Sequence, residues 1–204
     1  MKDNIWIVWV IALVVLTIII VSVRLILSAV QKKRGVYVHN KVDSILKRYG
    51  VIRNFKILRD FTLSADGESV HVEHALIGFF GIIFLTAKGE TADFYGDRKD
   101  EQWLMIKDEK KTKIENPIAK NEKAMSIARA ILGQHKIYSV PMEGLVVFSG
   151  NEKKTTIYCA DNTIIRYKNL SKYLNKAKFD KDNEIDVDVI EKLFLESSSQ
   201  SAAK

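Results

Sequence analysis

Glu73 and Lys88 are the two residues whose types and spacing favour a chemical role. They lie within residues 71–88, whose pattern predicts two apolar strands joined by a glycine-flanked turn. Period-two alternation places Glu73 on one face of the first strand, where the lysine that ends the second strand can meet it. Metal-dependent phosphodiester cleavage uses clustered carboxylates to hold a divalent cation and a lysine to orient or help deprotonate the attacking water. Thr86 stands two residues before Lys88, where this chemistry requires another carboxylate.

The hydrophobic pattern predicts the elements that position these residues. Asp66-Gly67 favours a tight turn that leads into the first of the two strands. Asn116-Pro117 is typical of a helix start, because asparagine caps free amides and proline fits the first turn. We expect helices at residues 37–49, 116–133, 170–177 and 187–196, and further strands at 55–63, 102–107, 111–115, 144–149, 155–158 and 163–167.

Composition narrows the classes of protein and partner. The 204 residues suffice for one domain and an appendage, and 47% hydrophobic residues support a packed core. A formal net charge of +7 permits binding to nucleic acid or to anionic lipid headgroups. Cys159 is the only cysteine, so the chain has no internal disulfide, which fits a reducing compartment. We assign Cys159 no catalytic role and expect a small buried residue.

The N-terminal segment predicts a membrane anchor. Residues 5–23 carry no charge, and as a helix they span roughly 28 Å, close to the thickness of a bilayer core. Basic residues follow at 32–34, so the positive-inside rule places the N-terminus outside and the rest of the chain in the cytoplasm. We therefore predict a single-pass protein of the cell membrane, in contact with lipid through residues 5–30. A cleaved signal peptide is the alternative, but the apolar run is longer than its usual core.

The order of motifs over residues 35–150 resembles the NERD (nuclease-related) domain. The supporting segments are a glycine-led helix from Gly35, V-E-H-A-L-I-G, G-I-I-F-L-T-A-K, Y-G-D followed by Trp103, N-P-I-A-K-N and L-V-V-F-S. The resemblance implies a restriction-endonuclease-like α/β fold, a mixed β-sheet flanked by helices, related to magnesium-dependent nucleases of the PD-(D/E)xK type. The predicted organisation is an anchor with a basic flank at 1–34, this domain at 35–150, an α/β C-terminal extension at 151–196 and a disordered tail at 197–204.

Carried over residue by residue, the resemblance implies a degenerate site. A glutamate of the family falls at His39, its strand aspartate at Glu73 and the glutamate of its E-x-K element at Thr86. Lys88 matches, and a family glutamine falls at Lys120. The resemblance thus leaves Glu73 and Lys88 as catalytic residues and Glu73 as the one metal ligand. It places Lys88 and Lys120 as contacts to nucleic acid.

Two arrangements would supply the missing ligands. Glu90 or Asp93, which follow Lys88, would swing in from a turn. Alternatively, His71 and Glu73 on one strand face would join His39 in a nitrogen-rich site for manganese or zinc.

Three functions follow from these observations, in order of preference. The first is a membrane-anchored domain that has lost catalysis and binds nucleic acid or another anionic partner, without a cofactor. The second is a protein-interaction scaffold at the inner membrane face. The third is an active nuclease with a non-standard site that uses Mg²⁺ or Mn²⁺.

Overall fold

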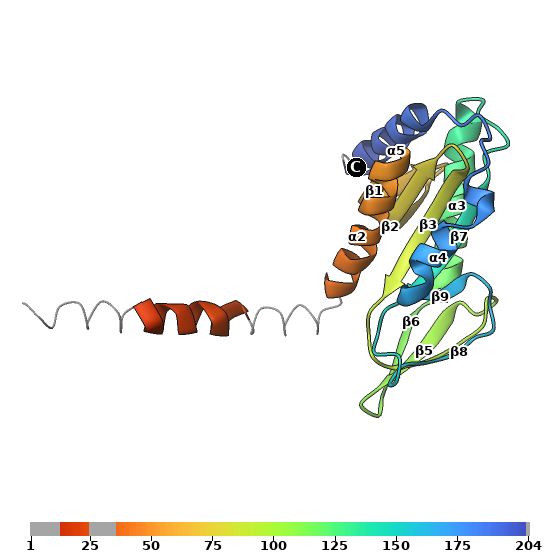
Figure 1. The fold of residues 1–204 in the computed structure, drawn as a ribbon. Helices are drawn as coiled ribbons and strands as arrows, with labels where there is room; N and C mark the ends of the chain where they lie inside the picture. Colours follow the sequence, from red (N-terminus) through yellow and green to blue (C-terminus); the bar gives the residue numbers. More distant parts are fainter. Residues whose placement is uncertain (1–12, 25–35, 203–204) are drawn as a thin grey trace, which may run out of the picture. The chain divides into compact units, whose positions relative to one another are not determined.

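The computed structural model describes residues 13–24 and 36–202, and Figure 1 shows how the elements within residues 38–202 are arranged. Residues 13–24 are helical with exposed side chains, and they belong to a unit apart from the compact unit Val38–Lys204. The predicted anchor, residues 5–30, lies partly outside the described residues. Within the described ranges, no helix combines the length and apolar character needed to cross a membrane.

A five-stranded mixed sheet forms the centre of the compact unit, which confirms the mixed sheet that the resemblance implied. Its order is β1-β2-β3-β7-β9, with antiparallel pairing from β1 to β3 and parallel pairing from β3 to β9. The strands are β1 (Lys56–Ala65), β2 (Glu68–Gly78), β3 (Gly81–Lys88), β7 (Met142–Phe148) and β9 (Ile164–Arg166). Asp66 and Gly67 both have positive φ, which suits the right-handed twist of the predicted β1–β2 hairpin.

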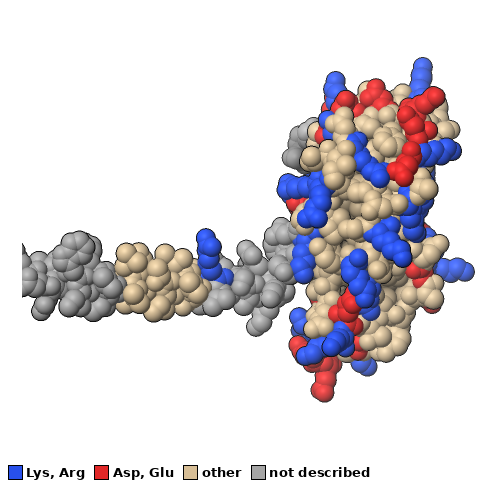
Figure 2. All heavy atoms as spheres, viewed as in Figure 1, with Lys and Arg blue, Asp and Glu red and all other residues tan. Residues whose placement is uncertain are grey.

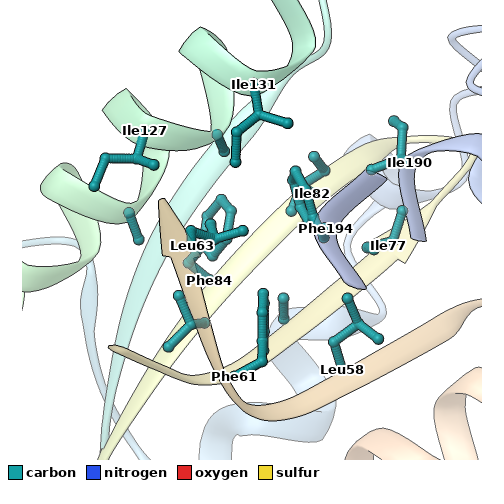
Figure 3. Packing of buried hydrophobic residues seen from close by; sticks show 14 of the residues in the cluster. Leu58, Phe61, Leu63, Ile77, Ile82, Phe84, Ile127, Ile131, Ile190 and Phe194 are labelled. Carbon is teal, nitrogen blue, oxygen red and sulfur yellow. The ribbon is translucent and has the colours of Figure 1, made fainter. Parts of the chain in front are cut away.

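Helices cover both faces of this sheet and bury two hydrophobic clusters. The helices are α2 (Val36–Arg53), α3 (Pro117–Gln134), α4 (Leu170–Leu174) and α5 (Val187–Ala202). Side chains of α3 and α5 meet one face, where Figure 3 shows Ile127, Ile131 and Phe194 packed over Phe61 and Phe84. Side chains of α2 and α4 contribute to the cluster on the opposite face.

The strict alternation predicted for β2 is wrong, because the strand changes face at Glu73. Val70 and Val72 share a cluster with Ala75 and Ile77, whereas strict alternation would separate these two pairs. β1 changes face at the same level, opposite Glu73, where Asp60 has a φ of +48°. An aspartate tolerates this left-handed conformation better than most residues, so the kink is local and the register is kept on both sides.

A second sheet packs against the end of the first. Its order is β6-β5-β4-β8, and the strands predicted at residues 102–107 and 111–115 form its antiparallel β5–β6 pair. The strands are β4 (Asp93–Tyr95), β5 (Gln102–Lys107), β6 (Lys110–Glu115) and β8 (Thr156–Tyr158). Trp103, Phe94 and Phe148 lie in the cluster that joins the two sheets, and Cys159 is partly buried against it. Because β8 and β9 come from the C-terminal extension, the extension completes both sheets.

Two helices continue beyond their predicted ends. α2 runs through Gly50 to Arg53, and a Cβ at position 50 would lie 2.9 Å from the Cδ1 of Ile57. Gly50 therefore permits close packing against β1 instead of ending the helix. α5 continues to Ala202, into the segment predicted as a disordered tail. The hydroxyl of Ser197 donates to the Ser64 carbonyl and accepts the Ser64 amide, which binds this part of α5 to β1.

Arg98 ties the loop after β4 to α3 and to the segment before β9, and this contact predicts an acid-sensitive component of stability. Its guanidinium donates to both carboxylate oxygens of Asp161, at 2.9 and 3.0 Å, and to Glu122. Burial raises the pKa of Asp161, but hydrogen bonds from Arg98 and Thr163 outweigh burial and bring it from 3.8 to about 2. The stabilisation is thus complete above about pH 4 and disappears as the pH falls towards 2.

We expect Asp161→Asn to lower the unfolding free energy at pH 7 by on the order of 1–2 kcal/mol, since Arg98 is partly exposed and solvent screens the pair. The loss should shrink between pH 4 and pH 2, as followed by thermal unfolding. Asp108→Asn at the exposed β5–β6 turn is the control and should show no such dependence. An Asp161→Asn penalty that is equal at pH 7 and pH 2 would contradict this account.

Candidate functional site

The predicted site residues converge at the carboxyl end of β3. Glu73 lies in β2 beside this end, Thr86 and Lys88 belong to β3, and Lys120 lies in the first turns of α3. The position of α3 is fixed at its start, because the Asn116 side chain accepts hydrogen bonds from the amides of Ile118 and Ala119. The same side chain donates to the carbonyls of residues 97, 98 and 100 in the loop after β4.

Glu73 is buried, and both of its carboxylate oxygens are occupied. Oε2 accepts a hydrogen bond from the Ala87 amide at 2.7 Å. The paired residues of β2 and β3 end at His74–Leu85, so this bond lies just beyond the last pair. Oε1 accepts the Lys120 ammonium at 3.1 Å, and only 14% of the lysine and 10% of the glutamate side chain is exposed. One carboxylate oxygen therefore takes the place of a backbone carbonyl as the acceptor for the Ala87 amide. The other neutralises the charge of Lys120.

Electrostatics keep Glu73 ionised. Burial by itself raises the pKa of this carboxyl group. The Ala87 hydrogen bond, the charge and hydrogen bond of Lys120, and the charge of Lys88 together outweigh burial, so the pKa is below its ordinary value. Glu73 is consequently a carboxylate at neutral pH, paired with a cation supplied by the protein itself.

Thr86 belongs to a neutral network on the other side of the site. Its hydroxyl donates to the Asn121 Oδ1 at 2.8 Å, and the Asn121 amide donates to the Leu145 carbonyl at 3.1 Å. Both side chains are buried, at 1% and 5% exposure. A Cβ on Gly144 would lie 2.8 Å from the Asn121 Cβ, so glycine is needed for α3 to approach β7 this closely. The position of the expected glutamate thus holds a satisfied hydroxyl.

Lys88 ends β3 beside Phe148 and is half-buried. Its ammonium makes no ion pair or hydrogen bond with any residue of the described ranges. Its charge acts on Glu73 at longer range. Of the two lysines predicted to contact nucleic acid, Lys88 is therefore available, whereas Lys120 is bound to Glu73.

The described side chains do not come together as either of the alternative ligand sets. His71 is exposed and lies 3.8 Å from Asp60, while the Glu73 carboxylate turns to α3 because β2 changes face between them. The His39 side chain lies outside the described residues. Asp93 is fixed in β4 instead of a turn, and among the described side chains no three of the His, Cys, Asp or Glu type gather as a metal site.

Sequence reasoning missed the role of Asn121, although this residue ends the N-P-I-A-K-N segment. The available signal was a polar residue on the apolar face of a helix, between Ile118 and Ala124 at helical spacing. A buried amide at such a position needs hydrogen-bond partners from another element. Thr86 and the Leu145 carbonyl provide them.

Comparison with known proteins adds one result. The sequence pattern of the nuclease-related domain family, NERD, matches residues 34–149. No curated protein matches the chain, and no solved structure does. The matched residues make up more than half of the 204 and include Glu73, Thr86, Lys88 and Lys120. The chain therefore belongs to the nuclease-related domain family.

Proposed function

We propose that this chain is a membrane-anchored, cytosol-facing family member that does not cleave nucleic acid but binds it. The observation that carries the proposal is the ion pair between Lys120 and Glu73, at 3.1 Å in a largely buried position. The ammonium group holds the positive charge that a divalent metal would bring to the Glu73 carboxylate.

Loss of cleavage follows from the charge balance. Mg²⁺ requires several oxygen ligands, preferably anionic ones, in near-octahedral geometry. Among the described residues, no three His, Cys, Asp or Glu side chains gather as a metal site, and the oxygens of Glu73 already accept hydrogen bonds from Lys120 and Ala87. A metal ion would have to displace the Lys120 ammonium from Glu73. The positive charges of Lys120 and Lys88 nearby would also repel the metal ion. The Thr86–Asn121 pair would offer only neutral oxygens in return.

Cations near Lys88 support binding of a polyanion. The Ser149 amide donates to the Lys88 carbonyl at 2.9 Å, which places the start of the loop at residues 149–155 beside Lys88. Lys153 and Lys154 in this loop are exposed and have no ion pair with a described residue. Figure 2 shows Lys and Arg side chains spread over one face of the domain, with its largest acidic patch at the upper end. Phosphates can contact such lysines without base recognition.

The anchor is proposed from the sequence of residues 5–30 and the basic residues that follow. Cell fractionation tests it, with the full chain expected in the membrane fraction and resistant to extraction by high salt and alkaline carbonate. A soluble full chain, or one whose N-terminal residues are removed in mature protein, would contradict the anchor.

The decisive experiment uses the full chain in detergent with plasmid, single-stranded DNA and RNA. We expect no cleavage in Mg²⁺ or Mn²⁺ and binding that weakens as salt rises. A Lys88→Ala, Lys153→Ala, Lys154→Ala variant should lose most of this affinity, whereas Lys172→Ala on α4 should keep it. Metal-dependent cleavage abolished by Glu73→Ala and Lys88→Ala would instead establish an active nuclease. Binding to anionic vesicles without binding to nucleic acid would favour a scaffold at the membrane surface.

The ion pair also predicts that divalent metal does not stabilise the protein. A ligand that binds only the folded state raises its stability as the concentration exceeds Kd. We expect millimolar Mg²⁺ to move the Tm by less than about 1 °C. The shift in Tm is proportional to the free energy of binding, which should be negligible. Potassium chloride at equal ionic strength is the control. A rise in Tm that is specific to Mg²⁺ and lost in Glu73→Gln would show that metal displaces Lys120.

A further inference from the structure

A cavity lies at the opposite end of the central strands from the Glu73–Lys120 pair. Its volume is about 280 Å³, and it opens beside the first residues of β3 and β7, where Ile82 pairs with Met142. The candidate functional site lies at the other end of the same two strands, where Lys88 pairs with Phe148. The apolar lining residues are Phe80, Ile82, Ile83, Pro141, Met142 and Phe179.

The C-terminal extension supplies one wall and is hydrogen-bonded to the turn between β2 and β3. The Asn183 side chain donates to the Phe80 carbonyl at 2.8 Å, and the Asn183 amide donates to the Phe79 carbonyl at 2.9 Å. Phe80 and Phe179 form an edge-to-face pair with centroids 5.0 Å apart, and both rings are buried. The wall is therefore preorganised, which lowers the cost of ligand binding.

The charged residues at the cavity leave one positive charge in excess. Glu143 accepts hydrogen bonds from the Lys178 ammonium at 2.6 and 2.9 Å and from the Tyr173 hydroxyl, so its charge is balanced. Lys181 also lines the cavity, is exposed, and has no ion pair with any residue in the described ranges. An apolar chamber with a single unpaired ammonium at its edge is complementary to an amphiphilic monoanion.

The cavity volume limits the size of this ligand. At about 30 Å³ per water-sized group, the cavity holds on the order of ten non-hydrogen atoms. We propose that it binds a small monocarboxylate with an apolar body, whose hydrocarbon part fills the cavity while its carboxylate pairs with Lys181. This site is independent of nucleic-acid binding, and it gives the C-terminal extension a role in ligand recognition.

The test uses the full chain in lipid nanodiscs and 3-phenylpropanoate as the probe, followed by ligand-observed NMR with empty nanodiscs as baseline. We expect saturable binding that Lys181→Glu weakens by about tenfold through charge reversal. Lys172→Glu is the matched control, since this exposed lysine does not line the cavity, and it should leave the affinity unchanged. Met142→Trp should fill the cavity and abolish binding.

Charge selectivity decides the outcome. The neutral 3-phenylpropan-1-ol should bind more weakly than the acid, and 3-phenylpropylamine should not bind. Equal affinity for acid and alcohol, equal affinity of Lys181→Glu and the unchanged chain, or no saturable signal above empty nanodiscs would each overturn the proposal. If Met142→Trp fails to fold, Lys181→Glu still decides, because its side chain is exposed and unpaired.

Discussion

Replacement of Lys120 by methionine is expected to lower the free energy of unfolding by about 3–5 kcal/mol, the penalty for leaving a buried charge without its partner. Methionine keeps the length and apolar stem of the lysine but removes the ammonium that neutralises Glu73. The Glu73 side chain is only 10% exposed, and the substitution takes away both the charge and the hydrogen bond of Lys120 while the Ala87 amide still donates to it. Urea unfolding of the full chain, followed by circular dichroism, measures the loss.

Two controls separate this effect from a general effect of losing a lysine. Lys123→Met removes a lysine on the same helix whose partner, Glu68, is 3.9 Å away, with both side chains largely exposed. We expect a loss of about 0–1 kcal/mol there. Glu73→Gln in the Lys120→Met background should recover most of the loss, because it removes the buried charge that Lys120 neutralises. If Lys120→Met costs no more than Lys123→Met, the ion pair is not the stabilising replacement for a metal that we propose.

Local signals in the sequence predicted most of the elements. Asp66-Gly67 gave the hairpin turn and Asn116-Pro117 the start of α3, because both act through backbone conformation within a few residues. The change of face at Glu73 was not predictable by the same means. It depends on Asp60 in the neighbouring strand β1. The alternation of residues within β2 does not indicate which residue lies opposite Glu73.

The sequence predicted most of the residues that lie at the candidate site but not the ion pair and hydrogen bonds between them. The sequence identified Thr86 in place of a carboxylate and Lys120 in place of a glutamine. It did not reveal that Lys120 binds Glu73, since a lysine side chain reaches several positions and its partner depends on how α3 crosses β2. Asn121 completes the network through the Leu145 carbonyl, a backbone group that no sequence motif marks.

The boundary of the family match carries a further consequence, because residues 150–202 lie outside it but contribute helices and strands to the fold. This segment contributes β8 and β9 to the two sheets, and α4 and α5 to the two faces of the main sheet. A chain that ends at residue 149 would expose the apolar surface that Leu170, Leu174 and Phe194 now cover. We expect such a chain to be unfolded or aggregated, although it retains the whole family segment.

A point substitution tests the same argument without removing residues. Phe194 is fully buried, with ring centroids 6.3 Å from Phe61 and 6.2 Å from Phe84. Phe194→Ala should cost about 3–5 kcal/mol of unfolding free energy through lost burial and the cavity left behind. Leu195→Ala is the matched control, because Leu195 is the next residue of the same helix and is 49% exposed. This substitution should change the unfolding free energy by no more than about 0.5 kcal/mol. Equal small losses for both would mean that the packing of α5 on β1 and β3 contributes little to the stability of the fold.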